Sequence, residues 1–239
     1  NEVSGAGPVI EGNVFENNVG YAVYVSGNAL SGNLLFGDNS GSGNGTNGIG
    51  LGGTISGTLS SARSSLPYVI DYLTINAGST WTLPPGAVVK VVANYNYLEV
   101  YGRLEAVGTS DEPVVFTSLK DDSVGGDTNN DGDGSVAAAG DWHSIRIGAT
   151  GEGVFDHVEV RYGGGYYYNY SYYGNIHVEG VVSVTNSTIA NSGNYGIYAV
   201  QGVVSVTNST IADSGSYGIY VNEVSGAGPV IEGNVFENN

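Results

Sequence analysis

The sequence contains Gly180-Val-Val-Ser-Val-Thr-Asn-Ser-Thr-Ile-Ala190 twice, the second time unchanged at positions 202–212. The copies begin 22 residues apart (202 − 180 = 22), and the segments that follow them, 191–198 and 213–220, differ at only two positions. Alternating valines and short β-rich runs, separated by Asn, Ser and Gly, predict two or three short strands per unit. Such a unit cannot bury an apolar face alone, so we expect the copies to stack as coils of a right-handed parallel β-helix.

The two ends of the chain carry the same eighteen residues. Positions 1–18 read NEVSGAGPVIEGNVFENN and are identical to positions 222–239, an offset of 221 residues (222 − 1 = 221). The identity indicates slightly more than one period of a longer tandem array, and an engineered duplication is the alternative. We predict one continuous β-solenoid over residues 1–239, with about eight coils per 221-residue repeat. Its partner would be itself, by coil-on-coil continuation into neighbouring repeats or copies.

The composition suits a chain of many short strands and tight turns. Forty glycines alternate with short apolar runs, and no sustained period of 3.6 residues appears, so we expect an all-β protein with almost no helix. A net charge of −17 excludes a nucleic-acid surface, and the lack of cysteine excludes disulfides and thiolate chemistry. No apolar run is long enough to span a membrane. We therefore expect an extracellular or cell-surface protein.

The middle of the chain carries a more specific resemblance. It reads Leu73-Thr-Ile-Asn-Ala-Gly-Ser-Thr-Trp-Thr-Leu-Pro-Pro-Gly-Ala-Val-Val-Lys90, and later Pro113-Val-Val-Phe-Thr-Ser118 and Gly140-Asp-Trp-His-Ser-Ile-Arg-Ile-Gly148. These segments resemble bacterial and archaeal surface proteins with right-handed β-helix repeats, which are adhesin-like or fibre-forming. The resemblance implies the fold. It leaves the function open, because this fold carries adhesins, lyases, hydrolases and structural fibres.

An acidic insertion, residues 120–141, contains a candidate calcium site. Oxygen-bearing side chains alternate with other residues, and glycine stands at the sixth position, as in the first half of an EF-hand loop. The glutamate expected at position twelve is replaced by Ala138. A solvated acidic loop is the alternative to a structural calcium site. The predicted ligands are Asp127, Asn129, Asp131, Asp133 and Asp141, with Asp121 and Asp122 as further carboxylates flanking the loop.

A second candidate site is the tyrosine-rich loop, residues 163–175. Tyrosine offers a large contact area at low entropic cost, so the loop could pack against a neighbour, bind sugar rings or simply cover the solenoid. The six tyrosines are Tyr166, Tyr167, Tyr168, Tyr170, Tyr172 and Tyr173.

Asparagines recur with the coils. Asn186 and Asn208 occupy equivalent positions, Asn13 and Asn234 look like their counterparts, and stacked asparagines can form a hydrogen-bonded ladder. All of the Asn-X-Ser/Thr motifs could accept glycans. Two of them lie in predicted loops and are the better candidates, Asn44 and Asn169.

Enzyme chemistry has little support in the sequence. The dense polar clusters, His143 with Arg146 and Asp156-His157 with Arg161, alternate as the ordinary faces of strands do. We therefore predict no catalytic residues and no enzyme. The predicted role is a structural segment of an extracellular β-solenoid fibre, filament or stalk, stabilised by calcium. The alternative is a cell-surface carbohydrate-binding or polysaccharide-lyase-like module.

Overall fold

The computed structural model describes residues 9–34, 36–92, 97–165, 173–223 and 228–239. This part of the chain forms 22 strands and no helix, and it therefore contains no helix long and apolar enough to cross a membrane. The strands are β1 Val14–Glu16, β2 Tyr21–Leu34, β3 Ser40–Ser42, β4 Thr46–Ser61, β5 Tyr68–Ile75, β6 Thr80–Leu83, β7 Val88–Val91, β8 Leu98–Val100, β9 Arg103–Val107, β10 Val114–Ser118, β11 Ile145–Ile147, β12 Glu152–Asp156, β13 Val158–Arg161, β14 Gly174–Val178, β15 Val181–Thr185, β16 Thr188–Ser192, β17 Tyr195–Val200, β18 Val203–Thr207, β19 Thr210–Ser214, β20 Ile219–Asn222, β21 Val230–Glu232 and β22 Val235–Glu237.

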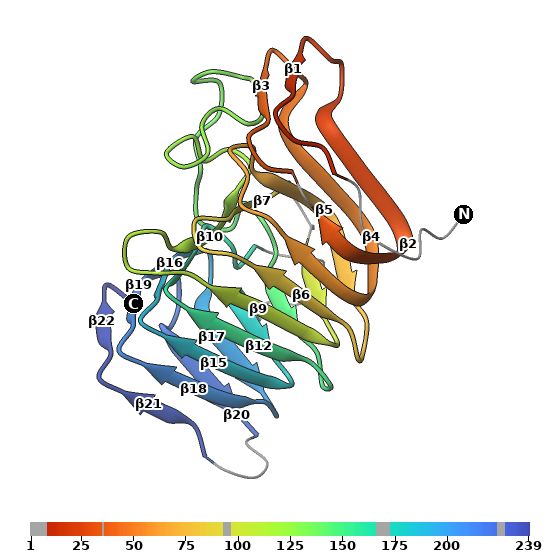
Figure 1. Ribbon diagram of the computed structural model, residues 1–239. Coiled ribbons are helices and arrows are strands. Elements are labelled where there is room, and N and C mark those ends of the chain that lie inside the picture. Colours follow the sequence, from red (N-terminus) through yellow and green to blue (C-terminus); the bar gives the residue numbers. More distant parts are fainter. Residues whose placement is uncertain (1–8, 35, 93–96, 166–172, 224–227) are drawn as a thin grey trace.

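The strands stack in three parallel ladders that wind along the molecule (Figure 1). The first ladder runs β6–β9–β12–β15–β18–β21, the second β7–β10–β13–β16–β19–β22, and the third β8–β11–β14–β17–β20. Successive strands of the sequence therefore lie on successive sides of one solenoid. The prediction of an all-β parallel β-helix of about eight coils is confirmed.

The repeat of 22 residues appears directly in the register of the last coils. Val182 lies opposite Val204, and Thr188 lies opposite Thr210. In β15/β18 and β16/β19 each paired side chain lies opposite an identical residue of the next coil, so the interior there consists of rows of similar residues. Ile189 and Ile211 form one such row, and both are fully buried. Burying each such side chain stabilises the fold by roughly 1.5–3 kcal/mol.

The first coils are wider than the last ones. β2 and β4 are 14 and 16 residues long, and β4 pairs with β5 along its first half and with β6 near its end. The register of β4 shifts between Leu51 and Gly53, where Gly53 has a φ of +103° and an added Cβ atom would collide with the Gly27 carbonyl oxygen. β1 and β3 form a separate parallel pair beside these long strands (Figure 1).

The corners of the solenoid are made by residues in the left-handed region. His157, Asn186 and Asn208 have φ values of 51–52° and follow one another in successive coils. The next coil places Gly233 over Asn208, because Thr207 pairs with Glu232. Asparagine and glycine tolerate this conformation better than other residues do.

The predicted asparagine ladder is therefore displaced by one position. Asn234 lies over Ser209 rather than over Asn208, since Thr210 pairs with Val235. Its Oδ1 accepts from the Ser209 backbone N–H (2.9 Å), and its Nδ2 donates to the Val206 carbonyl oxygen (2.8 Å). Asparagines do satisfy turn backbone between coils, but from the residue after the left-handed corner.

Candidate functional site

The acidic insertion between β10 and β11 is fixed to the solenoid by a buried lysine. Lys90 has no exposed surface, and its Nζ donates to the backbone carbonyl oxygens of Asp121 (2.8 Å) and Gly126 (2.7 Å). Burial lowers the pKa of Lys90 to about 8, opposed by the charges of nearby aspartates, of which Asp121 acts most strongly. Lys90 thus joins the insertion, which is rich in Gly and Asp, to strand β7.

Two carboxylates at the ends of the insertion are held by cations. Asp121 accepts from Arg161 (2.8 Å) and from Thr117. Although burial would raise the pKa of Asp121, hydrogen bonds from Ser123 and Thr117 and the charge of Arg161 lower it. The Asp121 carboxylate therefore stabilises the start of the insertion.

The second of these carboxylates, Asp141, was predicted to close the calcium site. Its oxygens instead bind Lys120 (2.7 Å), the Ser118 hydroxyl (2.8 Å) and the Ala138 backbone N–H (3.0 Å). Asp141 therefore lies outside the group of three carboxylates described next, with its oxygens bonded within the protein.

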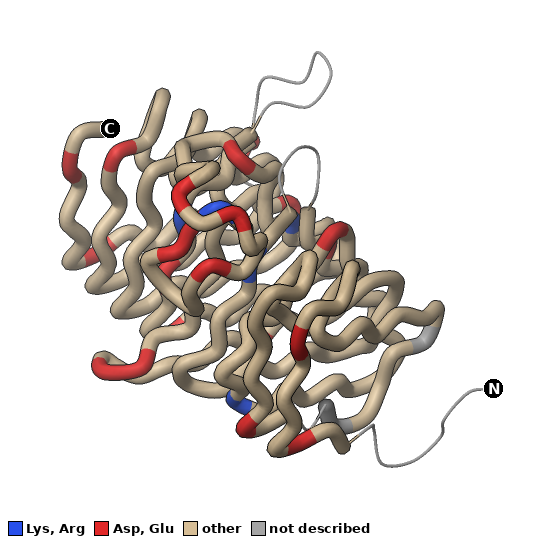
Figure 2. Tube along the Cα trace, turned by 90° about the horizontal axis from the view of Figure 1, so that it is seen from above, with Lys and Arg blue, Asp and Glu red and all other residues tan. Residues whose placement is uncertain are grey.

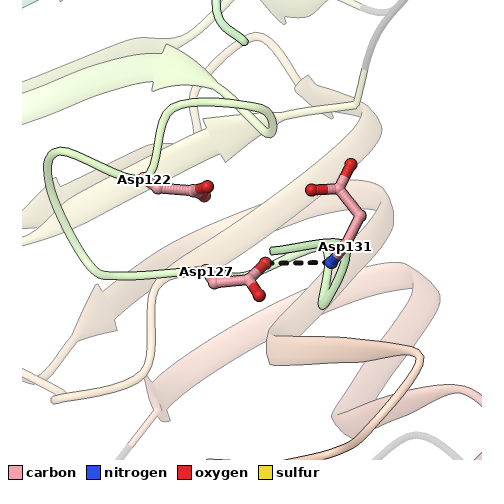
Figure 3. Close-up of side chains that lie close together, drawn as sticks. All are labelled: Asp122, Asp127 and Asp131. Atoms are coloured by element: carbon pink, nitrogen blue, oxygen red, sulfur yellow. Dashed lines mark hydrogen bonds between the residues drawn. The ribbon is translucent and has the colours of Figure 1, made fainter. Parts of the chain in front are cut away.

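Three other carboxylates converge in the loop (Figure 3). Asp122, Asp127 and Asp131 each offer an oxygen within 4.8 Å of the other two. The Asp127 carboxylate also accepts from the backbone N–H groups of Asp131 (3.1 Å) and Gly132 (3.0 Å), which curls the loop around it. Burial and then the charge of Asp127 raise the pKa of Asp122. A cation placed among the three would relieve this repulsion.

Of the remaining predicted ligands, Asn129 contacts a member of that group and Asp133 does not belong to it. Asn129 donates to the Asp131 carboxylate (2.9 Å) and to Ser135 (3.0 Å), and Asp133 is exposed to solvent. The donor set of Asp122, Asp127 and Asp131 fits a hard cation such as Ca²⁺, which takes six to eight oxygen ligands. Backbone oxygens or water would have to supply the others.

A second cluster follows the outer face of the third ladder. In register, Glu99 lies opposite Arg146, Arg146 opposite His177, His177 opposite Tyr198, and Tyr198 opposite Tyr220. Because residues at one register position point the same way in every coil, these side chains form a continuous row along the axis. We call this row, with its neighbours on the same face, the aromatic groove.

The groove consists of two adjoining hollows of about 330 and 230 Å³. Both are lined by Tyr173, His177 and Glu179. The larger hollow is completed by Ala149, Tyr198, Val200 and Gln201, and the smaller one by Tyr97, Glu99, His143 and Arg146. The groove thus crosses several coils and brings together residues that lie about a hundred positions apart in the sequence.

Rings contact one another along the groove in an unbroken series, tilted or edge-on except at its end. His143 lies 4.0 Å from Tyr173 between ring centroids, and Tyr173 lies 5.3 Å from His177. His177 then contacts Tyr198 (5.2 Å), which stacks nearly parallel on Tyr220 (5.5 Å, 16°). Three of these side chains are nearly buried: His143 is 6% exposed, and His177 and Tyr198 are 9% exposed.

The charges of the groove are nearly balanced. Arg146 forms ion pairs of 2.7 Å with Glu99 and with Glu179. Burial opposes protonation of Arg146, but its bonds to Glu179 and Glu99 raise its pKa. Arg146 is thus held as a cation, unsuited to act as a base. Burial lowers the pKa of His143 and of His177 to about 4, so both imidazoles are neutral at pH 7.

The structure adds residues that the sequence analysis had set aside. His143 and Arg146 were interpreted as ordinary strand faces, yet they converge with His177 and Glu99. Aligning Leu98-Glu99-Val100 with Ile145-Arg146-Ile147 and Ile176-His177-Val178 would have revealed the row. The cluster at Asp156-His157, by contrast, lies apart at a corner, where the two side chains contact each other at 2.9 Å.

Two loop predictions meet different outcomes. Tyr166, Tyr167, Tyr168, Tyr170, Tyr172 and Asn169 lie outside the described residues, whereas Tyr173 lines the groove. Asn44 has no exposed surface, and its amide is bonded to Asn18, Phe15 and Asn47. Asn44 is therefore a buried turn residue in the folded chain, where its side chain is not exposed for a glycan.

The charges outside these sites follow a simple pattern. Acidic side chains occur along the whole molecule, whereas the six Lys and Arg residues come from its middle, between Arg63 and Arg161 (Figure 2). Apart from Lys90, each of the six has a carboxylate within 4.0 Å. Both ends of the solenoid are therefore acidic.

The fold and the register together define a right-handed β-helix repeat protein. Residues 143–239 match the family model described as the right handed beta helix region. The match begins at His143, in the groove, and covers all of the regular coils. Searches of curated proteins and of solved structures found no match.

Proposed function

We propose that this protein is a structural segment of an extracellular repetitive β-solenoid, built into a surface filament or stalk. The single observation that supports this role best is the unbroken parallel ladder from the first coils to β22. Each coil is bonded to the next along the axis, so the unit is a rod rather than a compact globule. A rod of stacked coils advances about 4.8 Å per coil, or on the order of 40 Å for eight coils.

Calcium is proposed as a structural ion of this segment. The convergence of Asp122, Asp127 and Asp131 supports the proposal, as does the anchoring of the same loop by Lys90. A bound ion would close the outer part of the insertion, which has little apolar content, while Lys90 holds its inner part. The ion would have no role in catalysis.

Electron microscopy of the native material tests the structural role. A filament with a layer line near 4.8 Å and an axial repeat of about 40 Å is the expected result. Isolated short particles with no axial continuity would contradict the proposal and favour the second candidate below.

The second candidate is a carbohydrate-binding surface, and the aromatic groove is the observation that favours it. The rings of Tyr173 and Tyr198 can stack on sugar rings. The carboxylates of Glu99 and Glu179 can accept hydrogen bonds from the sugar hydroxyls. Glycan-array binding that is lost in Tyr198→Ser, but kept in Tyr72→Ser, would support it. Tyr72 is a matched control because it is an exposed tyrosine on the early strand β5 and outside the groove. Absence of any glycan binding would leave the structural role.

A further inference from the structure

The two copies of the duplicated segment are bonded on opposite faces. Positions 230–239, which contain β21 and β22, pair with the coil before them through β18 and β19. Positions 9–18, which contain β1, pair with the coil after them through β3. One sequence therefore shows, at two ends of one molecule, how the same coil is covered from either side.

The two copies use different backbone atoms for these bonds. In the C-terminal copy, the Glu232 carbonyl oxygen accepts from Asn208 (3.0 Å), and the Val235 N–H donates to Ser209 (2.9 Å). In the N-terminal copy, Gly12 and Asn17 donate to the next coil (3.2 and 3.1 Å), while the carbonyl oxygens of Asn13 and Asn18 accept from it (2.9 and 2.8 Å). None of these six backbone groups is used in both copies, so a single coil could form both sets of bonds at once.

The asparagine contacts extend in the same way. Asn234 accepts from Ser209 and donates to the carbonyl oxygen three residues before it. One coil further on, Asn39 makes the same pair of contacts with Asn13 (3.0 Å) and with Ile10. Because Asn13 and Asn234 are the same position of the duplicated segment, the rows join as Ser209, Asn234 and Asn39.

A second row runs parallel to the first. Asn239 accepts from Ser214 (3.3 Å) and donates to Ile211 (2.8 Å). Asn44 repeats these contacts with Asn18 (3.0 Å) and with Phe15 (2.8 Å). Asn18 and Asn239 are again the same position, so this row also continues through the duplicated coil.

The left-handed corners align as well. Gly233 (φ +65°) follows Asn208, and its duplicate Gly12 (φ +67°) precedes Asp38 (φ +54°). At the other corner the duplicate of Asn238 precedes Gly43, where an added Cβ would lie 2.6 Å from the Asn17 side chain. Backbone conformation, hydrogen bonds and side-chain rows thus agree on one register.

We propose that the C-terminal coil, positions 230–239, is a docking surface for the part of a second copy that begins at residue 19, and that it takes the place that positions 9–18 hold over β3 in this chain. The copy's β3 coil would lie on it with Val235 opposite Ser40, Phe236 opposite Gly41 and Glu237 opposite Ser42. The joint would cover the apolar side chains that the last coil exposes, which are Val230 (43%), Ile231 (40%), Val235 (50%) and Phe236 (50%). The proposal rests on the structural role above and names its partner.

The joint would use the duplicated segment only once. If Asn239 is followed by the residues that follow Asn18, the two copies become one coil, shared by consecutive repeats. Phe15 packs against the core from the side that Phe236 leaves open, so in the shared coil one ring would be covered on both sides.

A two-repeat chain tests the register. Residues 1–239 are followed directly by a second copy of 19–239, with Glu237→Cys in the first repeat and Ser42→Cys in the second. Adjacent strands place paired Cα atoms about 4.8 Å apart, within reach of a disulfide, and the native chain contains no cysteine that could interfere. We expect nearly complete intramolecular disulfide formation on mild oxidation, detected by mass spectrometry of the linked peptides.

Two controls make the result decisive. Ser40→Cys in place of Ser42→Cys is equally exposed but two residues out of register, and should crosslink at least tenfold more slowly. Glu16→Cys with Ser42→Cys in the single chain joins strands that are already paired, and should crosslink fully. Crosslinking of this positive control, with no preference for Ser42 over Ser40 at the joint, would overturn the proposal.

Electron microscopy of the same two-repeat chain separates the joint from the structural role. A straight double-length rod with the disulfide is the expected result. A straight rod without the disulfide would overturn the register and leave the structural role intact. A disulfide in a particle that bends freely at its centre would support the joint and contradict a rigid stalk.

Discussion

The regular coils from β15 to β20 and the insertion between β10 and β11 are stabilised in different ways. In the coils, identical apolar residues stack in register, as Ile189 does on Ile211. In the insertion, buried polar groups such as Lys90 and Asp121 hold a loop that has few apolar side chains. The stability of the coils depends on stacking side chains of the same size in successive coils. The stability of the insertion depends on individual hydrogen bonds to its buried polar groups.

This difference teaches where a solenoid can vary. A coil must preserve the row it shares with both neighbours, because each side chain is packed by its equivalents. An insertion leaves the rows intact and needs only local partners. It can therefore hold a separate site, here the three aspartates, without disturbing the ladder that carries the structure.

Interrupting an apolar row should have the largest effect. Ile211→Ala removes a fully buried side chain between Ile189 and Phe236, and we expect a loss of about 2–5 kcal/mol of unfolding free energy. Denaturant unfolding measures it. Val181→Ala, on an exposed position of β15, is the control and should change stability by less than about 0.5 kcal/mol. Equal losses in the two variants would refute the row as the source of stability.

Removing the buried lysine should act locally and somewhat less strongly. Lys90→Met leaves the buried carbonyl oxygen of Asp121 without its donor, at a cost of about 1–3 kcal/mol, whereas the carbonyl oxygen of the exposed Gly126 still accepts from Thr128. Hydrogen exchange should rise in the insertion and stay unchanged in β15–β20. The exposed pair Arg63–Glu112 offers a contrast, because Arg63→Ala should cost at most about 1 kcal/mol. Uniform loosening of the whole solenoid in Lys90→Met would argue against a local anchor.

The groove histidines should make stability depend on pH. Both have a folded pKa of about 4, below the unfolded value of 6.5, so between these values the unfolded chain binds more protons. Stability is therefore complete above pH 6.5 and is lost as the pH falls toward 4. Each unit of pKa difference corresponds to about 1.4 kcal/mol. His177→Phe should flatten the profile of unfolding free energy in this window, and an unchanged slope would exclude His177 as its source.

Calcium should give the smallest effect. At several-fold excess over its Kd, an ion bound only to the folded chain adds about 1 kcal/mol, which appears as a rise of a few degrees in Tm. Chelation should reverse it, Asp131→Ala should abolish it, and Asp133→Ala should leave it unchanged. If the Tm of the native chain does not change when calcium is added, the three aspartates form only a solvated acidic turn.

The sequence predicted the fold because the repeat is nearly perfect in the last coils. Val182 and Val204 are identical residues in equivalent positions of consecutive coils, so the repeat period and the strand lengths can be read from the sequence. The cation site stays a prediction, and of the three carboxylates that converge in the loop the sequence analysis named Asp127 and Asp131 as ligands and Asp122 as a flanking carboxylate. Linear spacing suggested Asp141, whereas Lys120 binds that carboxylate in the folded chain.

The aromatic groove escaped detection for another reason. Its members are spread from Tyr97 to Tyr220, and the coils between them differ in length because of the insertion. Equivalent positions therefore cannot be counted along the sequence until the ladder fixes the register. The burial of Asn44 could not be predicted for a related reason, since it depends on contacts with Phe15 and Asn18 in the preceding coil.

The axial direction of the ladder has a mechanical consequence. Tension applied between the two ends of the chain would load the bonds of the outermost coil first, because each coil is held chiefly by its neighbours along the axis. Rupture should then proceed one turn at a time, as in unwinding a spring. Each 22-residue turn would release a length on the order of 70 Å of extended chain. Such a rod would yield gradually under load and could rewind when the force is removed.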